Sequence, residues 1–224
     1  MQAREFAIRI DAERGTSGLL IAPANASVCY VFAHGAGAGM RHPFMEAVAR
    51  ELAERNVATL RYQFHYMETG AKRPDPPKLA HAAVRAAVAK AAEILQHVPT
   101  IAGGKSFGGR MTSQAQALTP LAGVKGLAFL GFPLHASGAP CDERAGHLLD
   151  VRVPMFFVQG TRDALADMAL MKPLIKKLGA RATMHVVADA DHSFHVPAKS
   201  GRKDAEVRHE FLDAFAAWAA KVAV

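Results

Sequence analysis

A glycine-rich run in the middle of the chain, residues 101–110, reads IAGGKSFGGR. Residues 104–108 fit the pattern G-x-S-x-G, in which a strand turns abruptly into a helix with serine at the apex. Glycine fits both outer places because side chains two positions from the serine would collide in this strained turn. Chance produces only about 0.05 such matches in a chain of this composition. We therefore interpret Ser106 as a candidate nucleophile.

The same run also resembles the end of a phosphate-binding P-loop, G-x-x-x-x-G-K-[ST], at residues 104–106. That motif needs glycine at position 99, where the chain has Pro99. It also needs a loop before the lysine, whereas residues 100–102 have the apolar character of a strand. A P-loop is therefore excluded.

Short apolar runs alternate with longer amphipathic segments on both sides of this turn. The runs predict buried strands at residues 28–33, 57–60, 100–102, 124–130, 154–158 and 183–187. The amphipathic segments predict a helix that begins at Pro43, helices at 78–97, 107–118 and 166–178, with Pro173 kinking or splitting the last of these, and a final helix from about 202 to the C-terminus. This alternation predicts one α/β domain over residues 1–224, with a mostly parallel sheet and helices on both faces.

A serine nucleophile needs a base and a carboxylate that orients the base. Asp163 follows the expected strand at 154–158, and His192 follows the expected strand at 183–187. Both residues fall beyond the carboxyl ends of strands, where open sheets place functional side chains. An unperturbed imidazole titrates near about pH 6.5 and is a neutral base at neutral pH. We expect His192 to take the proton of Ser106 while Asp163 orients the imidazole.

Other acids and bases remain as alternatives to this assignment. Asp167 is the alternative acid, although it is expected inside the following helix, and His195 is the alternative base. Asp189 and Asp191 lie too close to His192 in the sequence for the usual geometry and are interpreted as loop carboxylates.

A second glycine-rich segment, residues 34–39, follows the expected strand at 28–33 and reads HGAGAG. A dinucleotide-binding loop, G-x-G-x-x-G, would require glycine where Met40 stands. We instead expect an oxyanion hole, in which backbone N–H groups stabilise the charge that develops on a carbonyl oxygen. Ala36 and Phe107 are the expected donors, with Gly37 as the near alternative to Ala36.

These elements, in this order, resemble the alpha/beta-hydrolase superfamily. Residues 34–39, 103–110 and 131–135 are more narrowly similar to compact, lidless predicted hydrolases related to dienelactone hydrolase, whose eukaryotic relatives include a subunit of a histone-acetyltransferase complex. Dienelactone hydrolases use a cysteine nucleophile, and Ser106 departs from that pattern. The resemblance implies one alpha/beta-hydrolase domain without a large lid. It also implies four candidate substrate-contacting residues, each with a solvent-facing or supporting position as the alternative: His34, Lys105, Arg110 and His135.

Composition excludes several other classes of protein. The 27 Lys and Arg exceed the 20 Asp and Glu, giving a formal charge of +7, but the basic residues do not cluster, and no nucleic-acid partner is expected. Cys29 and Cys141 offer no metal-ligand spacing, and neither a metal nor another cofactor is expected. No apolar run approaches the about 18 residues of a membrane span, and the N-terminus lacks a secretory pattern. A cytoplasmic location is therefore expected.

The function favoured by the sequence is a serine hydrolase of the carboxylesterase or thioesterase kind. It would cleave a small ester or thioester through an acyl-enzyme on Ser106, with a small acyl compound as its partner. The alternative is a protein-interaction module that keeps the fold without enzymatic activity, as the basic composition and the chromatin-associated relatives suggest. The sequence leaves open the oligomeric state and whether the long connection at residues 62–77 covers the site.

Overall fold

One eight-stranded sheet forms the centre of the computed structural model, which describes residues 1–223. Its strands lie in the order β1-β2-β4-β3-β5-β6-β7-β8. Their bounds are β1 Arg4–Arg9, β2 Gly15–Ile21, β3 Val28–Ala33, β4 Val57–Tyr62, β5 Thr100–Lys105, β6 Val124–Leu130, β7 Met155–Gly160 and β8 Ala182–Val187. The six strands β3 to β8 pair in parallel with one another. At one edge of the sheet, β2 pairs antiparallel with β4, and β1 pairs antiparallel with β2. The predicted α/β fold with a mostly parallel sheet is confirmed.

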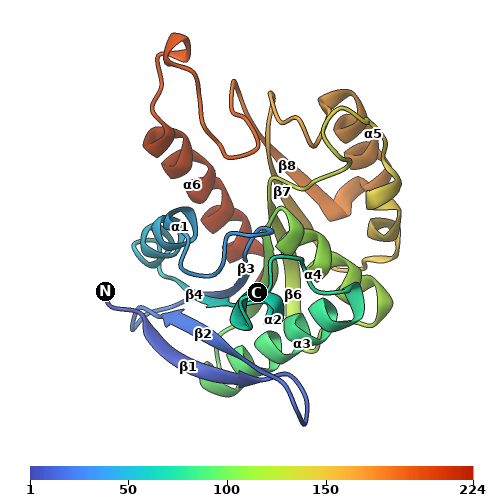
Figure 1. Cartoon of the computed structure of the whole chain (residues 1–224). Coiled ribbons are helices and arrows are strands. Elements are labelled where there is room, and N and C mark those ends of the chain that lie inside the picture. Colours follow the sequence, from blue (N-terminus) through green and yellow to red (C-terminus); the bar gives the residue numbers. More distant parts are fainter. Residues whose placement is uncertain (224) are drawn as a thin grey trace.

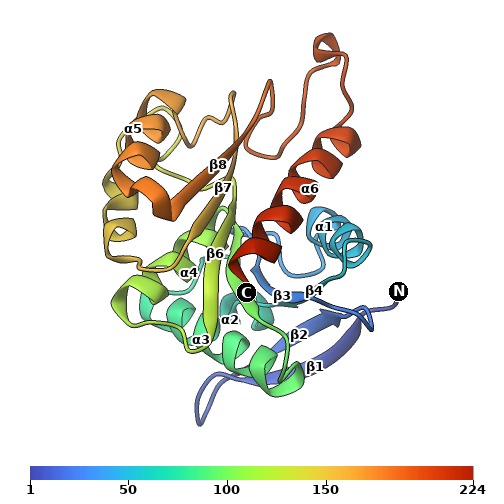
Figure 2. The same ribbon diagram turned by 180° about the vertical axis from the view of Figure 1, so that it is seen from behind.

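Helices cover both faces of the sheet (Figures 1 and 2). One face carries α1 (Pro43–Ala53) and α6 (Asp204–Val222), and the other carries α3 (Pro77–Ile94), α4 (Phe107–Leu118) and α5 (Met168–Leu178). The shorter elements are α2 (His65–Glu68) and the 3₁₀ turns η1 (Glu143–Asp150), η2 (Gly179–Arg181) and η3 (Ala198–Ser200). Every residue of β3, β4 and β7 is buried, which explains why these strands have almost no polar alternation.

The start of α1 follows from its sequence. Pro43 occupies the first turn, where its missing N–H would have no helical partner anyway. His42 caps the helix, with Nδ1 accepting a hydrogen bond from the Phe44 N–H at 3.2 Å. Val48 and Leu52, one turn apart, are both fully buried against the sheet. The predicted beginning at Pro43 is confirmed.

Pro173 does not split the helix as one of the two expectations had it, because α5 runs unbroken from Met168 to Leu178. Proline removes the hydrogen bond to the carbonyl four residues earlier, here that of Ala169. Both Pro173 and Ala169 are exposed, so water can satisfy the freed carbonyl and the helix continues.

Two parts of the fold were not anticipated. The antiparallel pair β1–β2 extends the sheet at its edge, and α2 gives structure to the connection at residues 62–77. Cys29 is a core residue of β3, and burial raises the pKa of its thiol to about 12. Within residues 1–223, none of the helices has both the length and the apolar character needed to cross a membrane.

Candidate active site

Three parallel strands of the same sheet, β5, β7 and β8, bring Ser106, Asp163 and His192 together at the carboxyl ends of the strands. Ser106 follows β5 directly, and the other two residues lie in the loops that follow β7 and β8. The Oγ of Ser106 is 2.9 Å from Nε2 of His192, and Nδ1 of that imidazole is 2.7 Å from Oδ2 of Asp163. Because an ionised carboxylate only accepts hydrogen bonds, Nδ1 carries the ring proton and Nε2 can accept the proton of the serine.

The backbone at Ser106 is strained in the way that the motif predicts. Ser106 has φ +50° and ψ −115°, a region that side chains other than glycine rarely adopt and that costs about 1–3 kcal/mol. A Cβ on Gly104 would lie 2.5 Å from the carbonyl oxygen of Ala33, and one on Gly108 would lie 2.6 Å from the same atom. Both glycines are needed because β3 passes this close to the turn.

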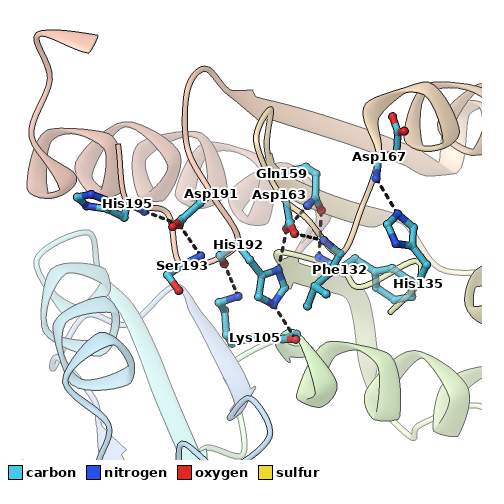
Figure 3. A network of polar contacts seen from close by, with 12 residues as sticks. Lys105, Phe132, His135, Gln159, Asp163, Asp167, Asp191, His192, Ser193 and His195 are labelled. Carbon is cyan, nitrogen blue, oxygen red and sulfur yellow. Dashed lines mark hydrogen bonds and ion pairs between the residues drawn. The ribbon is translucent and has the colours of Figure 1, made fainter. Parts of the chain in front are cut away.

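Gln159 fixes the carboxylate of Asp163, and sequence reasoning missed it. Its Nε2 donates to Oδ2 of Asp163 at 2.5 Å, while its Oε1 accepts from the N–H of Phe132 at 3.1 Å (Figure 3). The N–H of Leu165 donates to the other carboxylate oxygen at 2.8 Å. The Asp163 side chain is fully buried and accepts three hydrogen bonds. The signal was present: Gln159 is a polar residue inside an otherwise apolar buried strand.

The alternative acid and base lie elsewhere. Asp167 caps α5, with its Oδ1 accepting from the N–H of Ala169 at 2.7 Å. His195 is exposed and pairs with Asp204 at 2.9 Å, and Figure 3 shows it directed away from His192. Asp191 accepts from backbone N–H groups of its own loop, as expected of a loop carboxylate.

Comparison with known protein families gives a match over most of the chain. A family model described as an alpha/beta hydrolase domain matches residues 26–220. The chain belongs to the alpha/beta hydrolase family. The match spans every strand from β3 to β8 and all three residues at the sheet edge.

The fold of this alpha/beta hydrolase is similar to the solved structures of a serine hydrolase homologue, a serine hydrolase without lid and a dienelactone hydrolase. A serine hydrolase homologue from Coxiella burnetii has a TM-score of 0.75 at 20% identity, covering 95% of this chain and 96% of that one. A serine hydrolase without lid from Xanthomonas campestris has a TM-score of 0.76 at 19% identity, covering 97% and 95%. Dienelactone hydrolase from Anabaena variabilis has a TM-score of 0.73 at 22% identity, covering 99% and 97%. The resemblance inferred from the sequence is confirmed for the family and the fold, and it supports hydrolase activity.

An open cavity of about 470 Å³ lies beside Ser106 in this alpha/beta hydrolase. Most of its lining surface is apolar, although five of its eleven lining residues have polar side chains. The lining residues are Gly35, Ala36, Ala38, His42, Phe44, Met45, Lys105, Ser106, Leu165, His192 and Ser193. Small-molecule sites in proteins have this composition. Within residues 1–223, no group of three or more His, Cys, Asp or Glu is arranged to hold a metal ion.

The glycine-rich loop that follows β3 is held in place by the connection after β4. The N–H of Gly37 donates to the hydroxyl of Tyr66 at 2.8 Å, and the N–H of Met40 donates to Oε1 of Gln63, also at 2.8 Å. Because the N–H of Gly37 already donates to Tyr66, Gly37 is not an alternative to Ala36 as an oxyanion donor. Ala36 lines the cavity beside Ser106.

The connection at residues 62–77 holds the glycine-rich loop in place but does not cover the cavity. None of these residues is among those that line the cavity in the described part of the chain. Phe107, the other expected donor, is the first residue of α4, where a backbone N–H has no partner within the helix. Its ring packs edge-on against Phe64 with centroids 5.2 Å apart, which fixes this helix end against the same connection.

The expectation that His34 contacts the substrate is corrected by its position. His34 is fully buried and does not line the cavity. Its Nδ1–H donates to the carbonyl of Gly35 at 2.7 Å, and its Nε2 accepts from the N–H of Phe64 at 3.0 Å. Burial lowers the pKa of His34 to about 4, so the ring stays neutral and joins the glycine-rich loop to the segment after β4.

His135 and Arg110 also lie outside the cavity lining, which corrects the same expectation for them. His135 accepts from the N–H of Asp167 at 3.1 Å and donates to the carbonyl of Ala136 at 2.9 Å, so both ring nitrogens are used within the protein. Arg110 is half-buried in the first turn of α4. Of the four candidate substrate contacts, only Lys105 lines the cavity.

Proposed function

We propose that this protein is a serine hydrolase that cleaves a small ester or thioester through an acyl-enzyme on Ser106. One observation carries the proposal: a strained, partly exposed serine is linked by hydrogen bonds to an imidazole and a buried carboxylate, beside an open cavity. This combination supplies an activated nucleophile, an oriented base and room for an acyl group.

The reaction follows from the hydrogen bonds at the site. The Oγ of Ser106 attacks the acyl carbon while Nε2 of His192 takes the hydroxyl proton. The N–H groups of Ala36 and Phe107 are the proposed donors to the oxyanion, each contributing on the order of 3 kcal/mol to the transition state. The imidazolium then gives its proton to the leaving alcohol or thiol as the acyl-enzyme forms. Water, deprotonated by the same nitrogen, releases the acid and restores Ser106.

The cavity favours a compact acyl group. A volume of about 470 Å³ is at the small end for ligand pockets, and its walls are mainly Ala36, Ala38, Phe44, Met45 and Leu165. Short apolar acyl chains can be buried here, whereas a long chain would extend into solvent and gain nothing from its extra methylene groups.

The proposal is tested by hydrolysis of p-nitrophenyl esters and the corresponding thioesters with acyl chains of two to twelve carbons. We expect turnover of the short esters, with kcat/KM highest at short chains and falling with length. Absence of turnover throughout the series by the folded protein would contradict the proposal and favour the interaction module instead.

Replacing Gln159 with leucine is expected to lower both activity and stability. The change removes the donor to Asp163 and leaves the buried N–H of Phe132 without its acceptor, which costs about 1–3 kcal/mol of unfolding free energy. Loosening the carboxylate shifts the imidazole, and we expect kcat to fall about 10-fold or more. Urea unfolding and ester hydrolysis measure the two effects.

Gln116→Leu is the matched control for this change. Gln116 is also buried and accepts a backbone N–H, that of Leu121 at 2.8 Å, but it has no contact with the site. It should lose comparable stability with an unchanged kcat. Equal kcat values for the two variants would show that Gln159 has only a structural role.

A further inference from the structure

Lys105 is the residue immediately before Ser106, and its side chain runs toward the loop after β8. Its Nζ donates to the backbone carbonyl of His192 at 2.7 Å, an interaction drawn in Figure 3. His192 is therefore held twice by consecutive residues: its imidazole bonds to Ser106, and its carbonyl bonds to Lys105. No other residue joins the strand of the nucleophile to the backbone of the base among the hydrogen bonds of residues 1–223.

The same ammonium also lies over an aromatic ring of that loop. Nζ is 5.4 Å from the ring centroid of Phe194, within the range of a cation–π contact. Phe194 has φ +64°, an unusual conformation for a bulky residue, and its ring packs against Phe44 of α1 and Phe211 of α6. The side chain of Lys105 thus contacts the loop after β8 at two points, the carbonyl of His192 and the ring of Phe194.

The loop has internal order and is also held from two sides. Asp191 accepts from the N–H groups of Ser193 and His195 at 2.8 and 2.9 Å, which makes residues 191–195 a compact turn. The Arg162 N–H donates to the carbonyl of Ala190 at 2.9 Å, and the Val196 N–H donates to Asp204 of α6 at 3.0 Å. Neither of these bonds fixes the turn relative to β5, which is what the bond from Lys105 does. A shift of about 1 Å between a nucleophile and its base can cost 100-fold in rate.

We propose that Lys105 is a positioning residue, which anchors the loop of His192 to the strand of Ser106 and keeps imidazole and hydroxyl in bonding register. This role rests on the proposed hydrolase function. It assigns to Lys105 a task within the protein, where the resemblance implied a contact with the substrate.

The ammonium of Lys105 lies close to the imidazole of His192. A Cβ added at Gly131 would be 3.0 Å from Nζ and 3.4 Å from Nδ1 and Cε1 of His192, so both groups border the same point. The charged groups that face Lys105 are the carboxylates of Asp163 and Asp191. Burial lowers the pKa of Lys105 to about 8, and the two carboxylates oppose that shift.

Lys105→Met tests the role because it keeps an unbranched side chain only one atom shorter and removes both donor and charge. We expect kcat for a short ester to fall about 10- to 100-fold, with KM within about twofold of the wild type. Lys105→Arg, which restores a cationic donor, should recover part of the loss. Lys125→Met, an exposed lysine on β6, is the control and should behave as wild type.

The pH–rate profile separates positioning from a merely structural effect. The wild type should lose rate as pH rises through about 8, where Lys105 loses its proton, and Lys105→Met should lack that step. Lys105→Gln, which keeps a neutral donor, should also lack the step but lose less kcat, and it serves in place of Lys105→Met if that variant does not fold.

Each remaining outcome overturns the inference. A folded Lys105→Met with wild-type kcat and pH profile would show that the anchor is unnecessary. A raised KM with unchanged kcat would make Lys105 a substrate contact instead. Ser106→Ala, measured alongside, separates a failure of the hydrolase proposal from a failure of the role given to Lys105. If Ser106→Ala is as active as wild type, the hydrolase proposal fails. If Ser106→Ala is inactive while Lys105→Met has wild-type activity, only the role of Lys105 is overturned.

Discussion

Ser106→Ala is expected to lower kcat for short esters by about 10⁵-fold or more, because the alanine has no atom that can form the acyl-enzyme. The backbone should be unaffected, since Cβ is retained at the strained φ of +50°. Initial rates with a p-nitrophenyl ester, at enzyme concentrations high enough to detect a weak residual activity, measure the change.

Ser193→Ala is the control for this result. Ser193 lines the same cavity but has no bond to His192 through its hydroxyl in the described structure. Its replacement should leave kcat within about threefold of wild type, because no step of the proposed reaction uses its hydroxyl. A Ser106→Ala variant that keeps more than a hundredth of wild-type activity would mean that another group is the nucleophile.

His192→Ala is expected to reduce kcat by a similar factor, about 10⁵-fold, because a hydroxyl without an adjacent base is a poor nucleophile at neutral pH. The loss should be partly reversed by added imidazole, since the variant leaves a space between Ser106 and Asp163. Measuring kcat/KM against imidazole concentration shows whether the base is what was removed.

His195→Ala distinguishes the chosen base from its neighbour in the sequence. His195 is exposed, and its partner Asp204 raises its pKa, so it is positioned to stabilise the loop and the start of α6. We expect its replacement to change kcat by less than about threefold. A large loss in His195→Ala with a small loss in His192→Ala would reverse the assignment.

Much of the fold could be predicted from local patterns. The strands at 28–33 and 124–130 and the helix at 107–118 have the predicted bounds, because buried parallel strands and a glycine-flanked turn leave strong marks in the sequence. The edge strands β1 and β2 were missed, since β1 is mostly exposed and the apolar run of β2 is only three residues long, 19–21. Their place is decided by the pairing of β2 with β4 and of β1 with β2, which are tertiary contacts.

The residues at the sheet edge were predictable for the same reason. Ser106, Asp163 and His192 each follow a recognisable strand, and parallel strands deliver such residues to one edge. Residues that act through hydrogen bonds across the fold were not predictable in this way. Gln159 and Tyr66 have no motif of their own, and their roles depend on which carboxylate or backbone N–H lies opposite them.

His34 illustrates a further limit of motif reasoning. Its position beside the glycine-rich loop suggested a substrate contact, but its ring lies beneath that loop and bonds to Phe64. A residue adjacent to a functional loop in sequence can face the core as easily as the cavity. Lys105 differs from His34 in that it does line the cavity. Its ammonium nevertheless donates a hydrogen bond to the carbonyl of His192 within the protein.

Reaction with a fluorophosphonate, followed by mass spectrometry of the peptides, tests the nucleophile most directly. The reagent phosphonylates a serine only where a base and oxyanion donors activate it. We predict one adduct per chain, located on Ser106 and absent from Ser106→Ala and His192→Ala. An unmodified folded protein, or an adduct on any other residue, would contradict the account.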